Sequence, residues 1–378
     1  MRKLILLLAI AIAGTASAQD RTPIRIGTMF ETSGNIASLG NQGYEGAQIV
    51  RDQINKSGGI NGRPIELVQI NTESDETKSV TAVKRLLERE NVVALIGPHN
   101  SGSNFAIIDT VQRAQMPMIS NGTSAQIGSP AADKKWIFMS QVTDAVVVGA
   151  VIDYMKKHGI KKIGLLNADS AFAQSGREQW ELLAPKLGLQ LVIHETFGNS
   201  DQDMTPQLTK IRAADVDAVI IWAAGPGQAI AVKNYRQLGI DKPLYTSHGC
   251  VDPNLLRLAG DAINGIVCAS SKIAIAQDLP DNDPQRAGLL QFIADFHAKH
   301  GRNPSMFAGN GADSLKMLAD SIRNGGTSAE KIRDNLEGLK NFVGLNYMFS
   351  YSPQNHFGVE STSLAMMTVK DQKFVPAK

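Results

Sequence analysis

Short apolar runs alternate along this chain with longer stretches in which apolar residues recur at helical spacing. From Ile24 onward the alternation predicts strands that each lead into a helix, a pattern typical of a parallel sheet wrapped by helices. In the first part of the chain the predicted strands are 24–30, 65–70, 92–96, 116–120 and 136–141, with a helix over 43–56 and further helices between the later strands.

The same alternation starts again at Asp144. Strands are predicted at 163–167, 190–196, 218–223, 244–248 and 265–270, with helices near 173–188, 205–215 and 227–239. A polar link leads to helices near 284–300, 306–324 and 328–339, then to a strand at 347–351 and a hairpin over 363–375. About 360 mature residues exceed what one core usually organises. We therefore expect an α/β protein with two doubly wound, Rossmann-like parallel sheets.

The loop after the strand at 92–96 is the first candidate for binding chemistry. The apolar run stops at Gly97-Pro98, and a helical pattern resumes at Phe105. Ser101, Gly102 and Ser103 stand where a helix leaves its first N–H groups unpaired, so hydroxyls, amides and a positive dipole end are available to a carboxylate. The alternative is that Ser101 or Ser103 only caps its own helix.

Two more polar loops follow predicted strands, at 31–35 and at 121–125. Ligands of a doubly wound sheet bind beyond the carboxyl ends of its strands, and all three loops fall there. Each loop alone is also ordinary turn chemistry. Their shared position predicts a binding site at one edge of the sheet.

The first eighteen residues predict export. Arg2 and Lys3 precede an apolar run over 4–13, and Ala16-Ser17-Ala18 matches a signal-peptidase site, so 1–18 is the expected signal peptide. No later stretch approaches about 20 uninterrupted apolar residues, so membrane insertion is not indicated. The segment has no lipobox cysteine, and we expect a periplasmic protein.

The net charge and the two cysteines further restrict the class of protein. The formal net charge is +2 and is spread without a basic block, which gives no reason to expect nucleic-acid binding. Cys250 and Cys268 are the only cysteines. In an oxidising compartment they either pair or remain free, and their spacing does not resemble a zinc site.

The whole mature chain resembles the leucine/isoleucine/valine-binding family of periplasmic solute-binding proteins that serve ABC importers. The similar patterns lie at 27–34 with 40–43, 61–67, 96–103, 117–120 and 167–176. The resemblance implies a type I periplasmic binding fold, with a three-segment hinge at 139–142, 270–273 and 349–352. It places 19–141 plus 271–350 in lobe 1 and 142–270 plus 351–378 in lobe 2.

The resemblance also implies the ligand contacts. Those to a carboxylate fall on Ser101, or on Ser103 if the register slips, and on the loop Gly122, Thr123 and Ser124. From lobe 2 they fall on an aromatic, here Phe172, and on the segment near Gly225. Phe172 is alternatively a core residue.

One position departs from the family. Relatives that bind amino acids pair the ligand's ammonium with a carboxylate where this chain has His248. An imidazole does not replace that charge, so either Asp169 or Glu31 takes over the role or the ligand has no amine. The alternative is that His248 packs locally without touching solute.

We therefore expect a solute-binding protein that captures a small carboxylate, such as a branched-chain amino acid, by hinge closure. The alternatives are an amine-free organic or aromatic acid, or presentation of the ligand to a membrane sensor. We expect a monomer that meets ABC permease subunits. No Gly-x-Ser-x-Gly or His-Glu-x-x-His motif occurs, and His99 beside Ser101 is the only local pairing of catalytic type. Gly225-Pro226-Gly227 matches no nucleotide-binding fingerprint. From these motifs together we expect that the protein is not an enzyme and that it holds neither a cofactor nor a metal.

Overall fold

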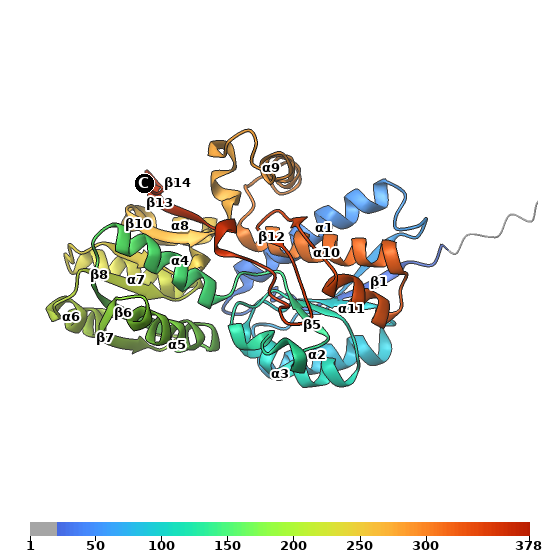
Figure 1. The fold of residues 1–378 in the computed structure, drawn as a ribbon, viewed down its shortest axis with the longest axis horizontal. Helices are drawn as coiled ribbons and strands as arrows, with labels where there is room; N and C mark the ends of the chain where they lie inside the picture. The colour runs from blue at the N-terminus through green and yellow to red at the C-terminus, as the bar shows by residue number, and fades with distance from the viewer. Residues whose placement is uncertain (1–20) are drawn as a thin grey trace, which may run out of the picture.

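A computed structural model describes residues 21–378, and the expected signal peptide at 1–18 lies outside these residues. The chain forms two main sheets, which Figure 1 shows side by side. The first sheet is parallel throughout, with strand order β2-β1-β3-β4-β5. Its strands are β1 (Ile24–Thr28), β2 (Ile65–Gln69), β3 (Ala94–Ile96), β4 (Met118–Ser120) and β5 (Ile137–Met139).

The second sheet has the order β14-β13-β10-β9-β8-β6-β7. The strands from β6 to β10 run parallel, and a C-terminal hairpin adds two antiparallel strands at one edge. The strands are β6 (Lys162–Ala168), β7 (Gln190–Phe197), β8 (Ala218–Trp222), β9 (Leu244–Thr246), β10 (Ile266–Ser270), β13 (Ala365–Lys370) and β14 (Lys373–Pro376). The expected α/β class with parallel sheets is confirmed.

Helices connect the parallel strands of each sheet. Those between strands of the first sheet are α1 (Ala37–Lys56), α2 (Glu76–Arg89) and α3 (Ser101–Arg113). The helices that precede or connect the parallel strands of the second sheet are α4 (Asp144–Lys157), α5 (Ala171–Lys186), α6 (Thr205–Ala213), α7 (Gly225–Gln237) and α8 (Pro253–Ala259). Within residues 21–378, no helix has both the length and the apolar character needed to cross a lipid bilayer.

The chain returns to the first sheet after β10. There it forms α9 (Arg286–His300), α10 (Met306–Gly325), α11 (Ala329–Glu337) and the short pair β11 (Phe342–Val343) and β12 (Met348–Phe349). Helix α10 packs against α1, and Figure 1 shows the orange α10 beside the blue α1. A Cβ on Gly46 of α1 would collide with the carbonyl of Ala308 in α10, so glycine lets the two helices approach closely.

Element boundaries differ from the predicted ones mainly near strand ends. Helix α1 begins at Ala37 rather than 43, and α3 begins at Ser101 rather than at Phe105. Strand β9 ends at Thr246, and the next residues form a 3-10 turn, η3 (His248–Cys250). These differences all fall in polar or glycine-containing segments, where hydrophobic periodicity is weak. They matter because the loops so redefined carry the candidate site.

Candidate functional site

A cavity of about 910 Å³ lies between the two sheets. Its walls come from the segments that follow β1, β2, β3 and β4 in the first sheet and β6, β7, β8 and β9 in the second, with one residue from α10. In both sheets these segments leave the carboxyl ends of parallel strands, which is where α/β folds bind ligands. The cavity is therefore a site that both sheets build together.

The first-sheet wall contains the N-terminus of α3. Asn100 caps this helix, because its side chain accepts a hydrogen bond from the N–H of Ser103 at 3.2 Å. Neither serine is the cap residue, so the simple capping alternative does not account for them. Ser101 lines the cavity and is 2% exposed, and its hydroxyl has no hydrogen-bond partner within residues 21–378. Ser103 is buried outside the cavity lining.

The loop after β4 contributes two lining residues, Asn121 and Thr123. Asn121 donates to the hydroxyls of Ser140 and Ser314, at 2.6 and 3.0 Å, which fixes its amide. Its Oδ1 has no hydrogen-bond partner in the described part of the chain. The loop therefore offers a free neutral acceptor beside the Thr123 side chain.

Gly122 and Ser124 flank Thr123 but lie outside the cavity lining. The N–H of Gly122 donates to Ser120 Oγ at 3.0 Å. The Ser124 hydroxyl donates to Ser175 Oγ of α5 at 2.8 Å, so it joins the two halves of the molecule. These two residues shape the loop and the contact between the sheets rather than the cavity surface.

His99 and Glu31 lie together, buried, on the same wall of the cavity, and Glu31 is one of the two residues that the sequence analysis offered as a partner for a ligand's ammonium. His99 lines the cavity and is 7% exposed, with rings of Phe30 and Phe307 beside its imidazole. Glu31 Oε2 lies 3.5 Å from His99 Nδ1, and Glu31 Oε1 accepts from the N–H of Asn100 at 2.8 Å. Glu31 is outside the cavity lining, whereas His99 is part of it.

The second-sheet wall centres on His248. Its ring packs edge to face on Phe172 and Trp222, with centroids 5.5 and 6.0 Å away. Burial lowers the pKa of His248 to about 3, so the imidazole is neutral at pH 7. Its Nδ1 has no hydrogen-bond partner among the residues that the structure describes. Phe172 and His248 both line the cavity.

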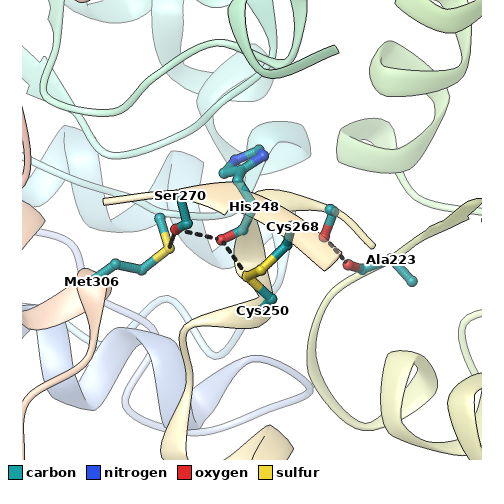
Figure 2. Close-up of a disulfide and its surroundings, with 7 residues drawn as sticks. Ala223, His248, Cys250, Cys268, Ser270 and Met306 are labelled. Carbon is teal, nitrogen blue, oxygen red and sulfur yellow. Dashed lines mark hydrogen bonds between the residues drawn. A yellow bond between two sulfur atoms is a disulfide. The ribbon is translucent and has the colours of Figure 1, made fainter. Parts of the chain in front are cut away.

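A disulfide between Cys250 and Cys268 anchors this histidine. It ties η3, which contains His248, to strand β10, and Ser270 of β10 donates its hydroxyl to the His248 carbonyl at 2.9 Å. Figure 2 shows the imidazole pointing away from the disulfide. The pairing that the sequence left open is thus present, and it fixes the backbone behind the cavity wall.

Asp169 and Gly225 stand at the edge of this wall. Asp169 lines the cavity but is exposed, and its carboxylate accepts from Gln174 at 2.7 Å. Gly225 is outside the lining, although its neighbours Ala224 and Pro226 are part of it. A Cβ on Gly225 would stand 3.6 Å from the carbonyl oxygen of Asn35 in the first-sheet half. The two halves therefore come close together here.

The polar atoms that line the cavity suit the binding of a small molecule. Ser101 Oγ and both His99 ring nitrogens lack hydrogen-bond partners within the described chain. The unpartnered polar groups of the lining are the Ser101 hydroxyl, the Asn121 amide oxygen and two imidazoles, and aromatic and aliphatic side chains line the cavity beside them. Such a mixture is typical of a small-molecule site.

Comparisons with known proteins define the class. A model of the family described as periplasmic binding protein matches residues 23–373, and the chain belongs to this family. A curated relative, Leu/Ile/Val-binding protein homolog 7 of Brucella melitensis, is 21% identical over 99% of this chain and 96% of its own length.

Two solved structures show the same fold. An extracellular ligand-binding receptor from Rhodopseudomonas palustris has a TM-score of 0.87 at 26% identity, covering 94% of this chain and 99% of its own. The substrate-binding protein of a branched-chain amino acid transporter from Streptococcus pneumoniae, in complex with isoleucine, has a TM-score of 0.82 at 26% identity, with the same coverage. The chain thus has the type I periplasmic binding fold of the leucine/isoleucine/valine-binding group.

Proposed function

We propose that this protein is the extracytoplasmic solute-binding component of an ABC importer. It captures a small carboxylate in the cavity between its two sheets and delivers it to the permease subunits from the periplasm, as a monomer. The observation that carries the proposal is the unpartnered Ser101 hydroxyl, buried at the N-terminus of α3 and lining the cavity. A helix N-terminus with free donors favours an anion.

The proposal includes closure of two lobes about a hinge. Lobe 1 comprises 19–141 plus 271–350, lobe 2 comprises 142–270 plus 351–378, and the crossings lie at 139–142, 270–273 and 349–352. The packing of α10 on α1 supports the assignment of the later helices to lobe 1. A solute that touches both walls favours the closed form through its differential affinity for that form.

A thermal-shift screen tests this function. The panel comprises aliphatic amino acids, 2-oxo acids and aromatic acids, because relatives in the group include an isoleucine-bound protein. A bound solute at about a hundred times its Kd raises the free energy of unfolding by roughly 2.7 kcal/mol. The methyl ester of each hit, which lacks the negative charge, is the control and shifts the melting temperature less. If no acid in the panel shifts it, carboxylate capture is wrong.

A further inference from the structure

Among the ionisable groups that line the cavity, the carboxylates are exposed and the imidazoles are buried. Glu76 and Asp169 are the carboxylates among the described lining residues, and both are exposed. His99 and His248 are the buried ionisable groups of the lining, with 7% and 2% exposure. The interior of the cavity therefore presents imidazoles, and the negative charges stand where water screens them.

The remaining nearby carboxylate, Glu31, does not reach the solute. It lies behind His99, with its two oxygens directed at the His99 ring and at the N–H of Asn100. Glu31 Oε2 has no hydrogen-bond partner among the described residues, and His99 Nδ1 lies 3.5 Å from it. The Asn100 N–H holds one oxygen of Glu31 and the His99 ring lies beside the other, so this carboxylate is not part of the surface that a ligand in the cavity touches.

A ligand ammonium would consequently be buried without an opposite charge. The Asn121 amide oxygen could accept a hydrogen bond from it, but a neutral acceptor supplies no counter-charge. Removing an ammonium from water without an ionic partner is costly. The interior thus disfavours amino acids relative to acids of the same carbon skeleton.

A carbonyl, hydroxyl or apolar group suits the same space. A neutral imidazole at His248 both donates and accepts hydrogen bonds. Phe172 and Phe307 add aromatic surface on opposite sides of the cavity, from α5 and α10. These groups complement an uncharged ligand body attached to a carboxylate.

We propose that the solute is an organic acid without an ammonium group, whose carboxylate binds at the N-terminus of α3 and whose uncharged body contacts His248 and Phe172. This inference rests on the proposed function, since it assumes capture of a carboxylate in this cavity. It makes His248 the residue that determines specificity.

Matched ligands test the inference by isothermal titration calorimetry on the mature protein. Each set shares one carbon skeleton: leucine, 4-methyl-2-oxopentanoate and 4-methylpentanoate, or phenylalanine, phenylpyruvate and 3-phenylpropanoate. In the set that binds, an amine-free acid is expected to have a Kd about tenfold or more below that of the amino acid, which corresponds to about 1.4 kcal/mol or more. Equal or tighter binding of the amino acid overturns the inference while leaving carboxylate capture intact. Binding of no acid in either set overturns both.

Two variants at one position sharpen the test. His248→Glu supplies the missing counter-charge, so the preference is expected to shift toward the amino acid by about tenfold or more. His248→Gln keeps a neutral donor and acceptor and is expected to retain the wild-type preference. The same shift in both variants contradicts a charge-based role for this position. Far-UV circular dichroism verifies folding, and the wild-type titrations decide the question if either variant fails to fold.

Discussion

The Ser101 side chain gives the most direct residue-level test of where the carboxylate binds. Ser101→Ala and Thr123→Ala are each expected to weaken solute binding by about 1–3 kcal/mol, because each removes a buried hydrogen bond to the ligand. Calorimetric titration measures the change. Ser103→Ala is the matched control, since this serine lies in the same helix turn but outside the cavity lining, and its affinity stays at the wild-type value. Loss of binding only in the Ser103→Ala control would contradict the placement of the carboxylate site at Ser101.

A second residue-level prediction concerns pH and stability. Asp144, at the start of α4, is buried, and burial raises its pKa to about 6 despite donors from Ser175, Ala145 and Ala125. Between the ordinary value of 3.8 and about 6, the folded state binds more protons than the unfolded state. The free energy of unfolding therefore falls as pH rises through this range, and the loss persists above it.

Asp144→Asn is expected to remove this loss. Relative to wild type, the variant gains stability as pH rises from about 4 to about 7.5, by up to about 3 kcal/mol, because each pKa unit is worth about 1.4 kcal/mol. Urea unfolding of both proteins at the two pH values measures the difference. A gap between them that is the same at both pH values would contradict the assignment.

Sequence predicted which loops build the site better than which side chains line it. Ser101, Thr123, Phe172, Asp169 and His248 line the cavity, whereas Ser103, Gly122, Ser124 and Gly225 do not. The direction of a side chain changes with each residue, so a loop located to within one or two positions does not identify its lining atoms. The pairing of His99 with Glu31 joins residues far apart in the chain, and local patterns carry no signal for it.

At the scale of elements, we expect the disulfide between η3 and β10 to contribute both to the free energy of unfolding and to solute affinity. The double variant Cys250→Ser, Cys268→Ser is expected to lose about 3 kcal/mol of unfolding free energy, because the bond closes a short loop. Solute affinity is also expected to fall, since η3 carries His248. Urea unfolding and calorimetry measure the two effects, with reduced wild-type protein as a comparison. Unchanged affinity in a destabilised variant would show that His248 needs no such support.

Periodicity located the sheet strands because they are buried apolar runs, as in β3 and β8. It located helix starts poorly where the first turn is polar or contains glycine. The first turns of α1 include Gly40, at which a Cβ would collide with the backbone of Glu31. Such close packing between neighbouring segments sets the boundary, and it is invisible to a pattern that registers only hydrophobicity.

At the scale of the whole molecule, two hydrogen bonds join the first-sheet loop after β4 to α5. They run from Ser124 to Ser175 and from Gln126 to Glu178, at 2.8 and 3.0 Å. If solute closes the two lobes, these contacts belong to the closed form, and saturating ligand is expected to reduce the radius of gyration measured by small-angle X-ray scattering. Ser175→Ala removes the contact with Ser124, together with a donor to Asp144, and is expected to weaken binding without altering the cavity lining. No change in radius on ligand addition would contradict hinge closure.

The C-terminal part of the chain packs on the N-terminal part, which a division of the sequence into consecutive domains does not predict. Two runs of alternating strands and helices predict two sheets, but the return of α10 to pack on α1 depends on contacts between residues more than two hundred positions apart. Only the family resemblance suggested that return. Composition and periodicity describe each sheet separately and contain no information about which sheet a later helix covers.

A crystal structure of the mature protein with a bound organic acid tests the central claim most directly. The account predicts the ligand in the cavity between the two sheets, with a carboxylate oxygen about 2.6–3.2 Å from Ser101 Oγ or from the Thr123 side chain. A ligand bound outside this cavity, or one whose carboxylate contacts neither the turn at Ser101 nor the loop at Thr123, would contradict it.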